Sequence, residues 1–199
     1  MLTLALLIGF ASPNHIVAQA SNKPSSSNQT AAVKSELHSH PDWPEAKPED
    51  VRTVRAIVEA FFNAISAPAG GKIDRERLRS LFVPDGRIEI PLPSTNGKPT
   101  DVVFLTPDQY ADGSDSETAT TGFFDRMLAL QVQQFGVMAH VYTSYESREK
   151  PEDPKPFVRG MKSLELLNSN GRWFLVQVSW DRERPNNPIP DRYLHDAEF

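Results

Sequence analysis

The dipeptide Asn170-Gly171 constrains this chain more than any other local feature. It lies between two long apolar-rich runs, residues 157–167 and 173–182, in which Val, Leu, Phe and Trp recur. Asn and Gly both accept the positive φ angles of a type I′ turn, which joins two antiparallel strands in a tight hairpin. The C-terminal part of the chain is therefore predicted to be antiparallel β-sheet.

Three segments upstream of the hairpin also have the composition of strands. Residues 123–135 are rich in apolar side chains, although their periodicity alone also allows a helix. Residues 137–148 combine Val, Tyr and Thr, and a short strand is predicted at 87–90, after a turn sequence at 84–86. These segments extend the hairpin into an antiparallel meander.

The residues before the first strand follow a helical period. Their apolar side chains recur at steps of three and four: Val51, Val54, Val58, Phe61 and Ile65. This spacing predicts one amphipathic helix that begins near Pro48, and a second helix is predicted from the N-cap Asp74 to about Phe82. Residues 91–121 are rich in turn-forming residues, with a short helical candidate at 106–111, and we expect them to form a lid or rim.

Helices followed by a short strand and a long meander resemble the nuclear transport factor 2-like superfamily, in particular its SnoaL-like members. Four stretches carry the resemblance, which covers about residues 50–184: AIVEAFFNAIS, LFVPDGRIEIP, FGVMAHVYTSYESR and FVRGMKSLELLNSNGRWFLVQVSWDRE. It implies an α+β fold in which N-terminal helices pack on a strongly curved antiparallel sheet and enclose a pocket. Because this fold hosts both enzymes and non-catalytic binders, the resemblance does not imply one function.

Steroid isomerisation, known on this fold, is not expected here. The resemblance places the isomerases' general-base aspartate at Ile90 and their helix tyrosine at or near Phe61. An apolar side chain cannot abstract a proton, so neither position supports that chemistry. The converging polar groups of the fold's epoxide hydrolases and dehydratases are not evident either.

The hairpin register predicts which residues face the pocket. A two-residue turn pairs Leu167 with Phe174 and Glu165 with Val176. Continued alternation gives one predicted concave face, consisting of Arg159, Met161, Ser163, Glu165, Phe174, Val176, Val178 and Trp180. The polar members of this face either contact a ligand or form an internal bridge between Arg159 and Glu165.

His140 and Tyr142 share one face of the preceding strand. Histidine is the side chain most often used for proton transfer near neutral pH, but a lone strand histidine also serves structural roles. The opposite face of this strand is comparably apolar, so the sequence leaves open which face points inward. The predicted ligand-binding residues are accordingly Phe61, His140, Tyr142, Arg159, Ser163, Glu165 and Trp180.

No cofactor or metal is expected. The chain has no cysteine, which excludes disulfides and thiolate metal sites. His38 and His40 lie in a polar, low-complexity segment, where nothing would hold coordination geometry. A formal charge of −5 and a pI near 5.5 argue against a nucleic-acid partner.

The chain is predicted to be exported. An apolar run followed by Ala18-Gln19-Ala20 is typical of a signal peptide over residues 1–20. Cleavage would begin the mature chain at Ser21 and leave it periplasmic or secreted, without a membrane association. The remainder divides into a disordered leader (21–47), the folded domain (48–184) and an extended tail (185–199).

Three functions are left open, and the residues do not decide whether the protein is an enzyme. The domain could bind a small, largely apolar molecule in its pocket. It could act as an isomerase, lyase or hydrolase with His140 or Glu165 as general acid or base. It could also be a scaffold, and a homodimer is expected through an outer sheet face that carries Trp173, Leu175 and Gln177.

Overall fold

A computed structural model describes residues 40, 42–92 and 101–198 of this chain. The predicted signal peptide and most of the predicted leader, including His38, lie outside the described residues. The described residues all belong to one folded unit.

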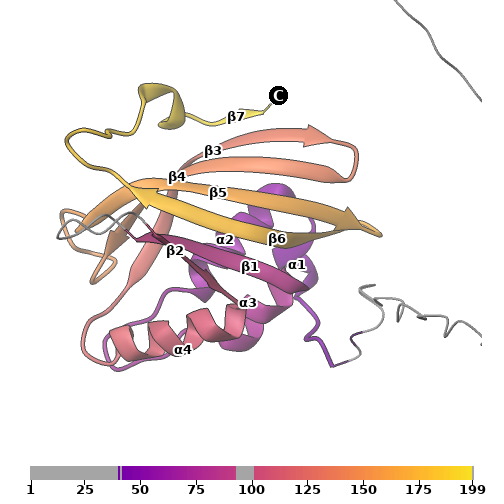
Figure 1. Cartoon of the computed structure of the whole chain (residues 1–199), viewed down its shortest axis with the longest axis horizontal. Coiled ribbons are helices and arrows are strands. Elements are labelled where there is room, and N and C mark those ends of the chain that lie inside the picture. Colours follow the sequence, from indigo (N-terminus) through magenta and orange to yellow (C-terminus); the bar gives the residue numbers. More distant parts are fainter. Residues whose placement is uncertain (1–39, 41, 93–100, 199) are drawn as a thin grey trace, which may run out of the picture. The chain divides into compact units, whose positions relative to one another are not determined.

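The fold is α+β, as predicted (Figure 1). The helices are α1 (Pro48–Val51), α2 (Val54–Ala64), α3 (Arg75–Leu81), α4 (Pro107–Thr118) and the short 3₁₀ helix η2 (Asp191–Tyr193). The strands are β1 (Phe82–Leu92), β2 (Asp101–Leu105), β3 (Phe124–Phe135), β4 (Met138–Arg148), β5 (Val158–Ser169), β6 (Arg172–Arg182) and β7 (Ala197–Glu198). The sheet order is β2-β1-β6-β5-β4-β3-β7. It is a mixed sheet because β1 runs parallel to β6 and β7 runs parallel to β3.

The predicted first helix is divided into two. α1 ends at Val51, and Thr53 takes an extended conformation before α2 begins. The Thr53 hydroxyl then accepts a hydrogen bond from the Ala56 amide at 3.1 Å, which caps α2 and satisfies one of its free donors. Asp74 caps α3 in the same way, accepting from the Arg77 amide at 3.1 Å, as predicted.

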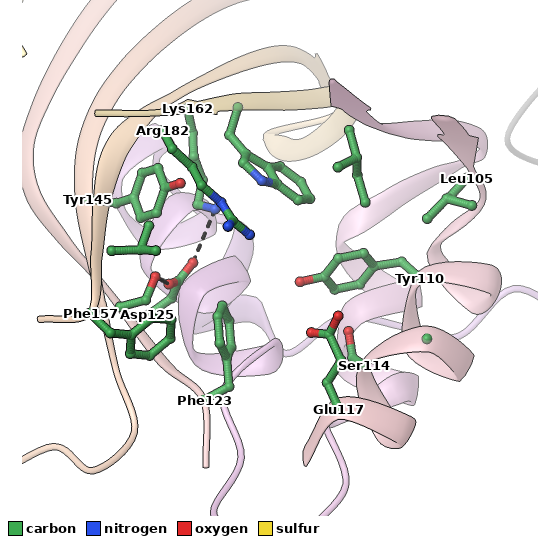
Figure 2. Close-up of a pocket in the computed structure, with 15 residues that line it drawn as sticks. Leu105, Tyr110, Ser114, Glu117, Phe123, Asp125, Tyr145, Phe157, Lys162 and Arg182 are labelled. Carbon is green, nitrogen blue, oxygen red and sulfur yellow. Dashed lines mark hydrogen bonds and ion pairs between the residues drawn. The ribbon is translucent and has the colours of Figure 1, made fainter. Parts of the chain in front are cut away.

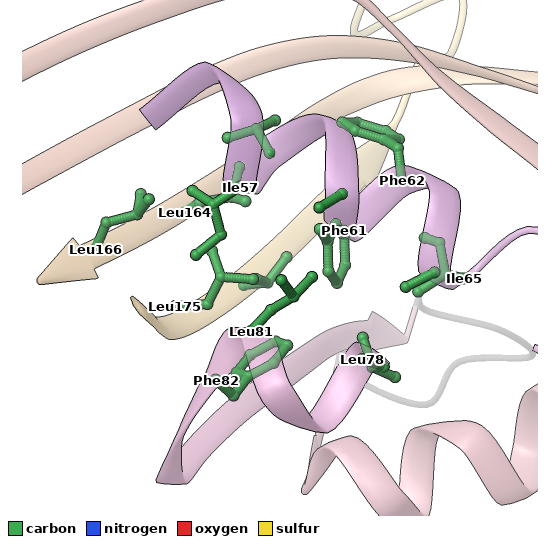
Figure 3. Packing of buried hydrophobic residues seen from close by; sticks show 14 of the residues in the cluster. Ile57, Phe61, Phe62, Ile65, Leu78, Leu81, Phe82, Leu164, Leu166 and Leu175 are labelled. Atoms are coloured by element: carbon green, nitrogen blue, oxygen red, sulfur yellow. The ribbon is translucent and has the colours of Figure 1, made fainter. Parts of the chain in front are cut away.

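The hydrophobic core lies between these helices and the sheet. Ile57 and Phe61 on α2 are fully buried against Leu164 of β5 and Leu175 of β6 (Figure 3). The ring of Phe61 also meets Phe82 edge to face, with centroids 6.2 Å apart. Burying side chains of this size contributes about 1.5–3 kcal/mol each, so this layer fixes how α2 sits on the sheet.

The predicted strands are all present, and two segments are longer than predicted. Asn170 and Gly171 have φ angles of 53° and 82°, which confirms the tight β5–β6 hairpin. β1 starts at Phe82, so the turn predicted at 84–86 is an irregularity within this strand. α4 is also longer than its predicted segment, and Thr106 and Gln109 form a capping box at its start.

One β-bulge changes the predicted register of this hairpin. Leu167 pairs with Phe174 as predicted, but Glu165 pairs with Gln177 and not with Val176. Val176 is the extra residue, and an extra residue reverses the inward and outward positions beyond it. Val178 and Trp180 therefore share a face with Leu164 and Lys162. The predicted concave face was wrong for β5 and for Phe174, which pairs with Leu167 on the outer face.

The C-terminal segment is more structured than the expected extended tail. After η2, the short strand β7 pairs with β3. Asp196 accepts a hydrogen bond from the Leu130 amide at 2.7 Å and forms an ion pair with Arg55 of α2 at 2.6 Å. Among the described residues, no helix combines the length and apolarity needed to cross a bilayer.

Candidate functional site

A cavity of about 180 Å³ lies where α4 faces the concave side of the sheet (Figure 2). Its apolar and aromatic lining consists of Ile90, Leu105, Tyr110, Phe123, Tyr145, Phe157, Val158 and Trp180. Its polar lining consists of Ser114, Glu117, Asp125, Ser147, Lys162 and Arg182. A mostly apolar concavity with a few polar groups is the usual composition of a small-molecule site.

Lys162 and Asp125 form a buried ion pair in the wall of this cavity. Lys162 Nζ lies 3.1 Å from Asp125 Oδ2, and the side chains are 3% and 0% exposed. No described residue donates an aligned hydrogen bond to Oδ2, so the contact is one between charges. The other oxygen, Oδ1, accepts a short hydrogen bond from the hydroxyl of Ser147, which lies opposite Asp125 on β4.

Aromatic rings surround the ammonium group of Lys162. Nζ lies 4.0 Å from the ring centroid of Tyr145, 4.4 Å from that of Trp180 and 5.5 Å from that of Phe62. Burial lowers the pKa of Lys162, while the charge of Asp125 acts in the opposite direction. Because the carboxylate and the rings both stabilise a cation, we assign Lys162 as a charged, structural part of the cavity wall.

Gly160 makes room for Tyr145 in this wall. A Cβ atom at position 160 would lie 2.2 Å from the Asp181 carbonyl oxygen and 2.9 Å from the Tyr145 hydroxyl. Burial raises the pKa of Tyr145, and burial likewise raises that of Tyr110 on the opposite wall. Both phenols therefore stay protonated at neutral pH and can donate hydrogen bonds to a ligand.

Two charged residues of opposite sign face the cavity from its two walls. Arg182, at the end of β6, directs its guanidinium into the space, and Glu117 of α4 lies on the side of Tyr110 (Figure 2). Neither forms an ion pair with another described residue. The described part of the chain also holds no cluster of three or more His, Asp or Glu side chains that could bind a metal.

Three of the predicted ligand-binding residues, His140, Tyr142 and Glu165, lie on the outer face of the sheet. His140 Nδ1 is 2.5 Å from Glu165 Oε1, and the His140 ring meets Tyr142 at 4.9 Å between centroids. Tyr142 in turn contacts Tyr193 of η2. None of these residues lines the cavity, so the general acid or base role predicted for His140 or Glu165 inside it has no geometric support.

The other predicted ligand-binding residues are divided between the cavity, the core and the surface. Trp180 lines the cavity. Phe61 is fully buried in the core and does not reach it. Arg159 and Ser163 lie on the outer face, and Arg159 forms an ion pair at 3.2 Å with Glu183, not with Glu165 as predicted. Ligand binding by these residues stays a prediction.

Two of the three residues predicted on the outer face for a dimer are buried in the structure. Trp173 is 6% exposed and Leu175 is 0% exposed, and both belong to the hydrophobic core. Of the three residues assigned to that face, Gln177 alone points outward, and it donates a hydrogen bond to Glu89 at 2.8 Å. The bulge explains this error too, because it puts Leu175 and Val178 on the same side of β6.

Sequence reasoning missed Lys162, Asp125 and Arg182, although the sequence carried a signal for each of them. Lys162 is in phase with the apolar Leu164 and Leu166, so it is a charge on a buried face. Asp125 similarly interrupts an apolar-rich strand. Arg182 continues the alternation of Val178 and Trp180 along β6, so it was in phase with the predicted concave face.

Several solved structures are similar in shape to this chain. They include an NTF2-like protein of unknown function from Silicibacter pomeroyi (18% identity, TM-score 0.45, covering 65% of this chain and 92% of that one). A protein of unknown function from Mycobacterium tuberculosis has 14% identity, a TM-score of 0.49, and coverage of 69% and 74%. A cystatin-like fold protein of unknown function from Nostoc punctiforme has 14% identity, a TM-score of 0.47, and coverage of 69% and 98%.

At identities of 14–18% and TM-scores below 0.5, the likeness concerns shape alone. No protein-family model matches the chain. No curated protein matches it either.

Proposed function

We propose that this domain binds a small, mostly apolar molecule in the cavity between α4 and the sheet. The observation that supports the proposal best is the composition of the cavity wall, in which aromatic and aliphatic side chains outnumber polar ones. At about 180 Å³, the cavity is below the roughly 300–1,000 Å³ typical of sites for drug-sized ligands, which favours a compact ligand.

Binding is supported better than acid–base catalysis. Of the two carboxylates that line the cavity, Asp125 is already occupied by Lys162 and Ser147. Glu117 is left without a histidine or a second free carboxylate in the lining. His140 and Glu165, the predicted acid–base residues, pair with each other on the outer face. Export of the chain and association into a homodimer remain part of the proposal, and both would suit a carrier or sensor of an extracytoplasmic molecule.

A substitution on α4 tests the proposal without disturbing the core. Gly113 lines the cavity, and a Cβ atom there would meet nothing within 4 Å. Gly113→Phe should therefore fill the cavity, whereas Gly113→Ala is the matched control that removes the glycine and leaves the space open. Both should keep or raise the unfolding temperature, because glycine costs a helix about 1 kcal/mol relative to alanine.

The measurement is native mass spectrometry of full-length protein purified from the organism that encodes it. The wild type and Gly113→Ala should carry a co-purifying small molecule, and Gly113→Phe should not. The same spectra report whether the chain begins at Ser21 and whether it is dimeric. Equal occupancy in all three proteins, or none in the wild type, would contradict binding in this cavity.

A further inference from the structure

We infer that the ligand is a compact zwitterion with an apolar side chain, of the size and charge pattern of an apolar amino acid. Its carboxylate would pair with Arg182, and its ammonium group with Glu117. The inference rests on the proposed function, since it names the chemistry of what that cavity would hold. The observations that support it are two charges of opposite sign that pair with no other described residue and lie on opposite walls of one cavity.

Arg182 is available to an anion because the nearby carboxylates are engaged elsewhere. Asp181 forms an ion pair with Arg184 at 2.6 Å, and Glu183 pairs with Arg159 at 3.2 Å. Asp125 neutralises Lys162. The Arg182 guanidinium forms no ion pair with a described residue and points into the cavity (Figure 2). A guanidinium presents several donors in a plane, which suits a carboxylate.

Glu117 is available to a cation because Arg75 pairs with the other acidic residues of α4. The other three acidic residues of α4 approach Arg75, with N–O distances of 3.6, 2.6 and 3.8 Å: Asp108, Asp112 and Asp115. Glu117 lies on the face of α4 that lines the cavity and has no such partner among the described residues. The Tyr110 hydroxyl lies on the same side and adds a donor or acceptor (Figure 2).

The charges of the cavity wall also select against a ligand with only one charge. Its four ionised side chains carry two positive and two negative charges: Lys162, Arg182, Asp125 and Glu117. An anion would be attracted by Arg182 but repelled by Glu117. A simple cation would be attracted by Glu117 but repelled by Arg182. A zwitterion that lies between them satisfies both, while its side chain contacts the apolar wall formed by residues such as Ile90, Leu105 and Phe157.

Isothermal titration calorimetry at low ionic strength with four matched probes tests this inference. L-phenylalanine carries both charges, 3-phenylpropanoate only the carboxylate, 2-phenylethylamine only the ammonium group, and 2-phenylethanol neither. We expect L-phenylalanine to bind tightest and each singly charged probe to bind about tenfold more weakly, because charge-assisted hydrogen bonds are lost.

Charge-removing variants assign each group to its partner. Arg182→Gln should weaken L-phenylalanine about tenfold and leave 2-phenylethylamine no weaker, and Glu117→Gln should leave 3-phenylpropanoate no weaker. Arg184→Gln is the control, since Arg184 pairs with Asp181 and does not line the cavity. Gly113→Phe should abolish binding of every probe.

The outcomes separate the inference from the proposed function. If the four probes bind equally, or if Arg182→Gln leaves L-phenylalanine unaffected, the zwitterion is overturned while a ligand cavity stands. The same holds if no probe binds but Gly113→Phe still expels a co-purifying molecule. If neither a probe nor a co-purifying molecule binds, the proposed function itself fails.

Discussion

Lys162 of β5 and Asp125 of β3 meet at 3.1 Å across the intervening strand β4, with both side chains almost wholly removed from solvent. This contact organises the cavity wall, because the same lysine lies against the rings of Tyr145 and Trp180. A buried ion pair costs desolvation energy, so each partner depends on the other to remain charged inside the protein.

Removing one member of this pair should therefore be costly. Lys162→Met leaves Asp125 buried without a counter-charge, and we expect it to lower the free energy of unfolding by about 3–5 kcal/mol. Lys162→Met combined with Asp125→Asn should be less destabilised than the single variant, because no uncompensated charge is left. Urea denaturation followed by circular dichroism measures both.

The half-exposed pair between Arg159 and Glu183 provides the control for this comparison. Arg159→Met should change the free energy of unfolding by no more than about 1 kcal/mol, as is typical of ion pairs near the surface. A Lys162→Met variant as stable as Arg159→Met would show that the buried contact does not hold in solution.

Two leucines of β5 test the register that the bulge at Val176 sets. Leu164 is fully buried, whereas Leu167 lies on the opposite face and is 41% exposed. Leu164→Ala should cost about 2–5 kcal/mol, and Leu167→Ala about 1 kcal/mol or less. Urea unfolding of the two variants decides between the faces, since a strand without the bulge would put Leu167, not Leu164, with Val178 and Trp180.

Two glycines should respond in opposite ways to alanine. At Gly160 the new Cβ would collide with the Asp181 carbonyl and the Tyr145 ring, and we expect a loss of about 1–3 kcal/mol. At Gly113 the Cβ has open space, and alanine should stabilise α4 by up to about 1 kcal/mol. Thermal unfolding of both variants measures the contrast. Equal changes in stability for the two variants would mean that Gly160 does not pack closely against Tyr145.

Glu146 should make the domain sensitive to acid. Burial alone would raise its pKa, but hydrogen bonds from Arg148 and Arg126, at 2.9 and 2.5 Å, outweigh burial and lower the pKa below its ordinary 4.5. A carboxylate with a lowered folded-state pKa stabilises the fold above its unfolded pKa, and this contribution is lost as pH falls through the folded value.

Glu146→Gln should therefore lower the free energy of unfolding at pH 7 by about 1–3 kcal/mol, and this difference should shrink towards pH 3. Urea denaturation at pH 7, 5 and 3 follows the change. Glu152→Gln, at an exposed loop position, is the control and should show little difference at any pH. A Glu146→Gln deficit that is constant with pH would point to packing and not to charge.

Local sequence patterns determined the elements of this fold. Asn170 and Gly171 accept positive φ angles whatever surrounds them, so the β5–β6 hairpin could be predicted from two residues. Asp74 caps α3 for an equally local reason. The apolar spacing that includes Phe61 predicted the buried face of α2, because burial follows the helical period.

The tertiary structure decided which face of β5 turns toward the cavity. Inward and outward positions in a strand alternate one by one, so the single extra residue Val176 exchanged Ser163 for Lys162 on the concave face. No local pattern predicts such a bulge, and the pairing of β6 with β1 shifts register at the same place. The meeting of Lys162 with Asp125 depends in turn on the order of β3, β4 and β5, which only the folded sheet specifies.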